Sequence, residues 1–240
     1  MTSFFVLFDR LALEHSFEYV VVENYQILDE VATDIIVVDK GGFDYYIFFE
    51  IEFENLKYIN DEIQILIATK FRDYLNSSDI DFSVSSFFEN NTFLIISTKV
   101  PKNIETKDFY KNVAAVEEDP YFFKKQIFYY TDEEISSLKI SNLNGSYVEH
   151  LKAVVSDIER YEKYIINEDD EYALVVRQFE KIPFLKLEVK EKELLSLRDI
   201  INKKIMKSKD VDISLIPDLL ALSDDELIDG WIESLGEEND

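Results

Sequence analysis

The stretch from Thr33 to Glu54 constrains the fold most, because it is typical of two apolar strands joined by a tight turn. Residues Thr33–Asp39 are mostly β-branched and aliphatic, and residues Tyr45–Phe53 are mostly aromatic and aliphatic, as is usual for strands packed in a core. Between them, Lys40-Gly41-Gly42 supplies the positive φ angles that a hairpin reversal needs. The sequence therefore predicts a β-hairpin around which the other elements are organised.

Helical and strand patterns alternate on both sides of this hairpin. Residues 2–17 and Asn55–Asn76 carry apolar side chains at helical spacing, whereas Glu18–Leu28 contains a strand and Thr92–Val100 is an apolar run of strand length. A helix that leads from a hairpin to a buried strand requires a crossover connection. We therefore expect an α/β fold, with a mixed sheet flanked by helices and a mostly helical C-terminal part.

The second half of the chain changes character at the turn-rich segment Asn142–Ser146. Before it, Tyr121–Tyr130 is a strand candidate, and Thr131 with Glu134 forms a capping box for a short helix. We predict an α/β domain over 1–142 and a helical domain with an acidic end over 147–240. The elements expected in the second domain are a helix over Tyr147–Ile166, a short strand over Tyr172–Val176, and helices over Glu191–Met206, Ser214–Leu222 and Ser223–Leu235.

The charge is strongly acidic, with 25 Lys and Arg against 50 Asp and Glu, a formal net charge of −25. This argues against a free-standing binder of nucleic acid, because phosphate contacts need basic side chains. It favours a protein that docks on a basic partner. Lys186–Lys209 carries eight Lys or Arg against four acids, whereas Asp210–Asp240 carries eleven acids and no Lys or Arg. A basic helix followed by an acidic one predicts an intramolecular or intersubunit pair.

The absence of cysteine excludes disulfides, thiolate zinc sites and a cysteine nucleophile, and it fits a reducing cytoplasm. The N-terminal apolar run contains Asp9 and Arg10 and follows no basic leader, so it is not typical of a signal peptide. No apolar run approaches the roughly 18–20 residues that a membrane span needs. We therefore expect a cytoplasmic protein without membrane contact.

Three carboxylates lie at the ends and on one side of the predicted hairpin: Asp34, Glu50 and Glu52. Glu50 and Glu52 are two residues apart, so their side chains leave the same face of a strand. Like charges beside an apolar run are costly unless they bind a cation, pair with a base or face water. The pattern therefore leaves two interpretations open, a divalent-metal site and a solvated strand edge.

With the order helix, three strands, helix, strand, these carboxylates resemble the restriction-endonuclease-like core over about residues 1–100. The family pattern is Asp, then Asp or Glu, any residue, then Lys; here Asp34 is followed by Glu50-Ile51-Glu52, so Glu52 replaces the lysine. The resemblance implies that Asp34 and Glu50 hold Mg²⁺, which stabilises phosphate charge, with Glu52 as a third ligand or a base. The missing lysine puts the activation of the attacking water in doubt.

Other catalytic arrangements fail in this sequence. The two histidines, His15 and His150, have no complete set of catalytic partners, and Ser146 near His150 lacks an oxyanion-hole glycine segment. There is no Gly-x-x-x-x-Gly-Lys loop, which excludes a P-loop ATPase.

A second resemblance is carried by Glu117–Thr131, whose sequence is EEDPYFFKKQIFYYT. This run is similar to a segment of the middle components of bacterial ABC-three-component systems, the group that includes Lamassu-type defence. The resemblance implies a small accessory subunit beside an SMC-like ATPase and a separate effector, often a nuclease. It brings no catalytic residues. From the residues alone, the run is an aromatic strand whose Lys124 and Lys125 face water.

The leading hypothesis is a non-enzymatic accessory subunit that bridges the ATPase and the effector without a cofactor. The alternatives are a Mg²⁺-dependent nuclease acting through Asp34, Glu50 and Glu52, and an acidic immunity or DNA-mimic protein. The residues expected to bind partners are Tyr121, Phe122, Lys124, Lys125, Trp231, Asp224, Asp225 and Glu226.

Overall fold

The structure is a computed structural model that describes residues 3–77, 80–138 and 145–187. The predicted helices over Glu191–Met206, Ser214–Leu222 and Ser223–Leu235 lie outside the described residues. The predicted partner-binding residues Trp231, Asp224, Asp225 and Glu226 lie there as well. None of the helices in the described ranges is long and apolar enough to cross a membrane.

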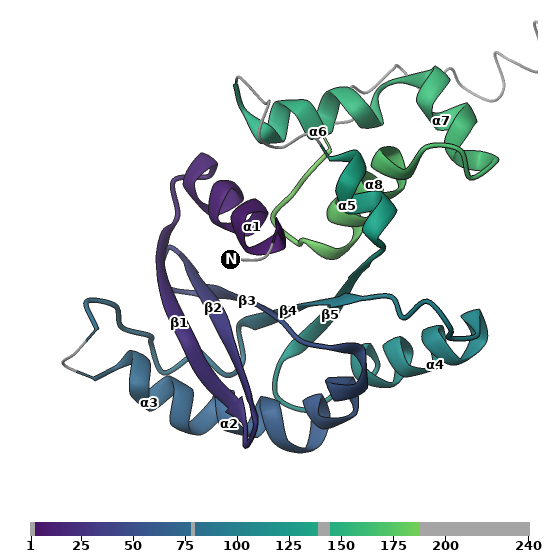
Figure 1. The fold of residues 1–240 in the computed structure, drawn as a ribbon. Coiled ribbons are helices and arrows are strands. Elements are labelled where there is room, and N and C mark those ends of the chain that lie inside the picture. Colours follow the sequence, from purple (N-terminus) through teal and green to yellow (C-terminus); the bar gives the residue numbers. More distant parts are fainter. Residues whose placement is uncertain (1–2, 78–79, 139–144, 188–240) are drawn as a thin grey trace, which may run out of the picture. The chain divides into compact units, whose positions relative to one another are not determined.

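A mixed sheet forms the centre of the described chain, and its strands lie side by side in chain order (Figure 1). The first two pairs of neighbours are antiparallel, and the next two pairs are parallel. The hairpin turn between the second and third strands contains Gly41 and Gly42, both with positive φ. This arrangement confirms the predicted α/β class and the hairpin. The strands are β1 (Glu18–Leu28), β2 (Val31–Lys40), β3 (Asp44–Glu50), β4 (Thr92–Lys99) and β5 (Lys124–Tyr130).

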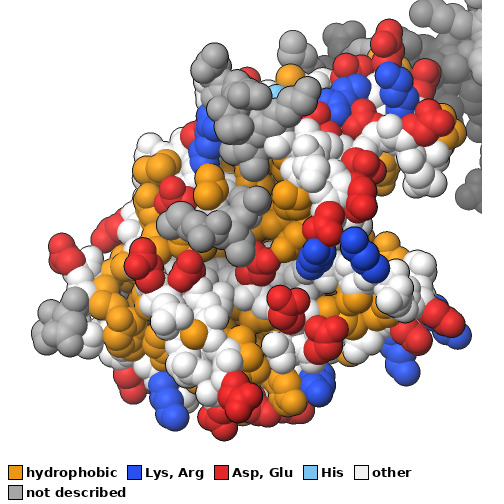
Figure 2. Space-filling model, viewed as in Figure 1, with side chains coloured by type: hydrophobic (Ala, Val, Ile, Leu, Met, Phe, Trp, Pro, Cys, Tyr) orange, Lys and Arg blue, Asp and Glu red, His pale blue; other side chains and the backbone are white. Residues whose placement is uncertain are grey.

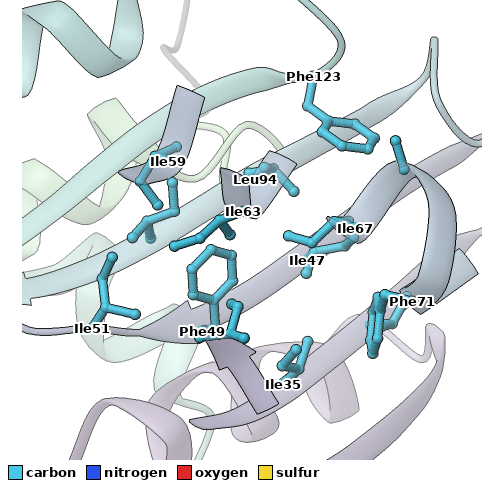
Figure 3. Close-up of a cluster of buried hydrophobic side chains, with 14 of the residues drawn as sticks. Ile35, Ile47, Phe49, Ile51, Ile59, Ile63, Ile67, Phe71, Leu94 and Phe123 are labelled. Atoms are coloured by element: carbon cyan, nitrogen blue, oxygen red, sulfur yellow. The ribbon is translucent and has the colours of Figure 1, made fainter. Parts of the chain in front are cut away.

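The sheet is buried on both faces, which explains why its central strands are nearly continuous apolar runs. Alternate residues of β2 enter different cores: Ile35 and Val37 enter one, and Ile36 and Val38 enter the other. The first core packs against the helical segment that follows β3, as Figure 3 shows for Ile59, Ile63, Ile67 and Phe71. The second core packs against helices from both ends of the described chain. The result is three layers, with helices on either side of the sheet.

The layer over the first core is formed by residues 53–75 and by α4 (Thr106–Glu117), which the sequence analysis did not predict. The predicted helix over Asn55–Asn76 is present but irregular. It runs through a 3₁₀ segment (Phe53–Tyr58), a π-helical turn (Ile59–Ile63), α2 (Gln64–Leu66), a second π-helical turn (Ile67–Phe71) and α3 (Arg72–Leu75).

The layer over the second core is formed by α1 (Ser3–Glu14), α5 (Asp132–Ser137), α6 (Tyr147–Val155), α7 (Ile158–Ile165) and α8 (Asp170–Lys181). The predicted capping box of Thr131 and Glu134 is present at the start of α5. The predicted single helix over Tyr147–Ile166 is wrong, because Asp157 interrupts it and caps α7 with its own side chain.

The predicted strand over Tyr172–Val176 is also wrong, since these residues lie inside α8. Tyr172, Leu174 and Val175 are buried together with α1 and α6, and this packing outweighs the β propensity of the valines. The division into domains at 142 and 147 stays a prediction, because 188–240 lies outside the described residues. Within 145–187, the helices share one hydrophobic core with α1 and the sheet.

The carboxylate of Glu14, in the last turn of α1, holds the start of α6. It accepts hydrogen bonds from the backbone N–H groups of Tyr147 (2.5 Å) and Val148 (2.9 Å) and from the hydroxyl of Ser146 (2.7 Å). Burial alone would raise the pKa of Glu14, but the two N–H groups, Ser146 and Arg10 outweigh it and lower the pKa to about 2. Glu14 therefore supplies the negative charge that the N-terminus of α6 favours.

We expect this contact to make stability depend on pH. Because the folded pKa lies below the ordinary value of 4.5, the contribution of roughly 1–3 kcal/mol is present above pH 4.5 and is lost as the pH falls toward 2. Urea unfolding of Glu14→Gln should show a flatter pH dependence across this window than the wild type. Glu18→Gln, at an exposed position, is the control and should keep the wild-type slope; equal slopes for all three proteins would contradict the assignment.

The outer edge of β5 is closed by charged side chains. The backbone N–H of Ile127 donates to the Glu117 carboxylate (2.7 Å), which also pairs with Lys181 (2.6 Å). Two residues along the strand, the carbonyl of Tyr129 accepts from the guanidinium of Arg177 (2.9 Å). Side chains of α4 and α8 thus meet around the strand and occupy backbone groups that an edge strand otherwise leaves free.

Candidate functional site

The loop that leads into β5 displays two aromatic side chains to solvent. Tyr121 is 67% exposed and Phe122 is 50% exposed. Phe122 adopts φ +56°, a left-handed conformation that a bulky residue rarely takes. The next residue, Phe123, turns inward and packs in the first core near Leu94 (Figure 3). Strained backbone of this kind concentrates at functional sites; the role of Tyr121 and Phe122 as contact residues stays a prediction.

A buried lysine fixes this loop. The side chain of Lys125 has no solvent exposure, and its ammonium group donates to the carboxylate of Asp119 (2.7 Å) and the amide oxygen of Gln64 (2.9 Å). It also donates to the backbone carbonyls of Tyr121 (2.9 Å) and Phe123 (3.3 Å). These contacts tie both ends of the aromatic turn to one charge, and they anchor it to α2. A turn held in this way loses little conformational freedom when a partner binds.

The expectation that both lysines face water is therefore wrong for Lys125 and correct for Lys124. Consecutive residues of a strand point to opposite faces, so one of the two had to turn toward the interior. Lys124 is exposed, and its ammonium lies 4.8 Å from the centre of the Phe93 ring. Of the predicted contact residues that the structure describes, Tyr121, Phe122 and Lys124 are exposed, while Lys125 supports them from below.

The three predicted carboxylates line a second feature, a cavity of about 310 Å³ at the ends of β2 and β3. Asp34, Glu50 and Glu52 contribute its polar side, and phenylalanines of α1 and β3 contribute its apolar side. Asp34 accepts a hydrogen bond from the backbone N–H of Asn24 (2.9 Å), at an irregularity in the pairing of β1 with β2. The hairpin and this irregularity therefore bring the three acids to one hollow.

Glu50 is the acid that the surrounding residues constrain most. One oxygen accepts a hydrogen bond from the hydroxyl of Tyr130 (2.5 Å), while the other is shielded from solvent and has no hydrogen-bond partner among the described residues. Burial raises the pKa of Tyr130, and the hydrogen bond to Glu50 raises it further, so the hydroxyl stays protonated and remains a donor. Tyr130 comes from β5, and the sequence analysis did not connect it with the hairpin.

The carboxylates do not form a shared metal site as they are placed. In the described part of the chain, no group of three or more His, Cys, Asp or Glu side chains is close enough to hold one metal ion. None of the described residues that line the cavity is Lys or Arg. Lys99, at the end of β4, instead pairs with Asp132 (2.7 Å). The hydrogen bond that the Lys99 ammonium donates to Asp132 is the main reason that the pKa of Lys99 is raised, and Glu52 adds a smaller contribution.

Comparison with known proteins gives one family. Residues 44–151, slightly less than half of the chain, match the family described as ABC-three component (ABC-3C) system Middle Component 1. No curated protein matches the chain significantly. No solved structure matches it either. The matched range includes the hairpin's second strand, the aromatic loop and Lys125, and it supports the resemblance inferred from Glu117–Thr131. Over residues 44–151, this chain is therefore similar to the middle components of ABC-three component systems.

Proposed function

We propose that this protein is a non-catalytic middle component of a bacterial ABC-three component defence system and bridges an SMC-like ATPase and an effector. The family match supports a place in a multi-component system, and such a place requires protein partners. The net charge of −25 suits docking on basic protein surfaces and disfavours unaided binding to nucleic acid. The single observation that carries the proposal is the aromatic turn fixed by Lys125.

The chemistry of this turn suits a protein interface. Aromatic side chains dominate the energetics of interfaces, particularly where a rigid scaffold presents them. Tyr121 and Phe122 extend from a turn whose carbonyls are bound to a buried charge, and the exposed Lys124 lies beyond them. The turn also lies at the centre of the segment that resembles the middle components. A partner would bury both rings without reorganising the loop.

The test uses the wild-type chain and the ATPase encoded by a neighbouring gene, mixed and separated by size exclusion. We expect co-elution, and we expect Tyr121→Ser with Phe122→Gly to weaken binding at least tenfold in calorimetry, since both are central aromatic contacts. Glycine at 122 accepts the positive φ, so this change removes the ring and keeps the turn. Phe43→Ser, which alters an equally exposed ring at the hairpin turn, is the control. Absence of co-elution at any salt concentration would contradict the proposal.

A metal-dependent nuclease remains the second candidate, because Asp34, Glu50 and Glu52 line one cavity. Mg²⁺ binds through one or two carboxylates and keeps several waters, so Asp34 and Glu50 are the residues that would hold it and orient a phosphate. The missing basic residues around the cavity speak against it. The same purified protein distinguishes the two candidates: cleavage of DNA or RNA with Mg²⁺ or Mn²⁺ that disappears in Glu50→Gln would replace the adaptor role with catalysis.

A further inference from the structure

Helix α7 (Ile158–Ile165) exposes the apolar stripe that an ordinary surface helix buries. Such a helix turns its apolar stripe to the core and its polar face to water. In α7, Ile158, Tyr161 and Ile165 follow the spacing i, i+3, i+7 and form one stripe, yet no residue of the helix is buried. Ile158 is 73% exposed, Ile165 is 59% exposed, and Ile166 extends the stripe just beyond the helix. Among the described residues, none covers the face that this sequence pattern is suited to bury.

The opposite side of α7 is held to the protein mainly by charge. The guanidinium of Arg160 binds both oxygens of Asp169 (2.7 and 2.8 Å) and one oxygen of Glu171 (2.8 Å) at the start of α8. These hydrogen bonds raise the pKa of Arg160 and lower the pKa of Asp169. Tyr164 adds a ring contact with Tyr172 of α8. Arg160 and Tyr164 thus hold one side of α7 to α8, and Tyr161 also contacts the Tyr172 ring from the edge of the stripe, whereas Ile158 and Ile165 stay on the exposed side.

The exposed stripe has an acidic border. Asp157, Glu159, Glu162, Glu168 and Asp170 are all exposed around α7, whereas Lys163 is the one exposed base between residues 157 and 171. Figure 2 shows acidic side chains, with basic ones among them, in the region where Figure 1 places α7. An apolar patch with a charged rim is typical of a surface that binds another protein, and the sign of the rim selects partners with positive charge.

We propose that this face of α7 is a docking site for an amphipathic helix of a partner protein, one that carries aliphatic residues on one side and Lys or Arg beside them. The stripe of Ile158, Tyr161 and Ile165 would pack against the aliphatic side of that helix. The acidic border would pair with the basic flanks. A second copy of the chain fits poorly, because two borders of the same sign would repel each other. The inference rests on the proposed partner-binding role and identifies a second surface for it.

The test measures binding of a model helix to the full-length chain. The probe is a fluorescein-labelled peptide of 18 leucines and lysines with leucine at helical three–four spacing, followed by anisotropy. We expect the wild type to bind it, and we expect Ile158→Ala with Ile165→Ala to weaken binding at least tenfold, as for central interface residues. Val6→Ala with Leu13→Ala, two exposed aliphatic positions on α1, is the matched control and should bind like the wild type. A leucine–glutamate peptide should not bind.

Each other outcome overturns the inference. If the leucine–lysine peptide bound the α7 and α1 variants equally well, charge alone would attract the peptide to the protein. Failure of the wild type to bind would show that the face is inert or that residues 188–240 fill it. A wild-type dimer in light scattering that α7 substitutions dissociate would assign the face to a second copy. Co-elution with the ATPase is measured separately, so loss of the peptide site with retained co-elution removes this inference and leaves the proposed function intact.

Discussion

Replacement of Lys125 by Met should lower the free energy of unfolding by about 3–5 kcal/mol, since removing one partner of a buried ion pair leaves the other uncompensated. Methionine fills most of the space, so the effect reports charge and hydrogen bonding rather than a cavity. Asp119, Gln64 and two backbone carbonyls lose their common donor. Urea denaturation at neutral pH measures the difference.

Lys124→Met is the matched control for this prediction. It removes the same charge one residue away, but from an exposed side chain that lies over the Phe93 ring. We expect the free energy of unfolding to change by less than about 1 kcal/mol, the usual contribution of an exposed cation–π contact. Lys125→Met should also weaken partner binding, because the turn with Tyr121 and Phe122 loses its support. Similar stabilities for the two variants would show that Lys125 is not the anchor of the loop.

Arg177→Met should lower the free energy of unfolding by about 3 kcal/mol or more, because it too removes one partner of a buried ion pair. The guanidinium binds both oxygens of Glu134 (2.9 and 3.0 Å) and the carbonyl of Tyr129, and it lies 4.0 Å from the centre of the Tyr129 ring. Both charged side chains are largely buried. Glu134 also completes the capping box of α5, so its loss of a partner disturbs two elements. Thermal unfolding followed by circular dichroism measures the change.

Arg72→Met provides the comparison for Arg177. Arg72 also contacts two acids, Asp73 and Glu89, but all three side chains are substantially exposed. Exposed ion pairs contribute between 0 and about 1 kcal/mol, and this is the loss we expect. An Arg177→Lys variant should lose an intermediate amount of unfolding free energy, between the losses of Arg177→Met and Arg72→Met. Lysine keeps the positive charge but lacks the planar guanidinium that binds both carboxylate oxygens. If Arg177→Met proved as mild as Arg72→Met, the link between α8 and β5 would not be a stabilising one.

The elements that could be predicted are those set by local patterns. The hairpin followed from two apolar runs around Gly41 and Gly42, and the capping box followed from Thr131 and Glu134 alone. Errors arose where tertiary packing decided the outcome. The valines of α8 suggested a strand, but Tyr172 and Leu174 at helical spacing pack against α1 and α6. The break before α7 depends on one capping side chain, Asp157. The helical spacing of apolar residues does not reveal such a break.

The candidate sites also contain residues that the sequence identified and residues that it did not. The sequence identified Asp34, Glu50 and Glu52, and the structure places them around one cavity. It did not identify Tyr130, which reaches Glu50 from a strand 80 residues later in the chain. The burial of Lys125 depends on Gln64, which is 61 residues away, and no local signal indicates such a pair. A signal was nevertheless present in Lys124-Lys125, because two consecutive strand residues cannot both face water on a sheet covered on both sides.

The closed edge of β5 limits how other proteins can recognise this one. Many complexes form by adding a strand to a free sheet edge, in which case the main chain supplies the affinity and sequence matters little. Here Glu117 and Arg177 already engage the N–H of Ile127 and the carbonyl of Tyr129. Addition of a strand is therefore disfavoured along this part of β5, whereas β1 forms the other edge of the sheet. At this edge, recognition by another chain would therefore depend on side chains rather than on main-chain pairing at Ile127 and Tyr129.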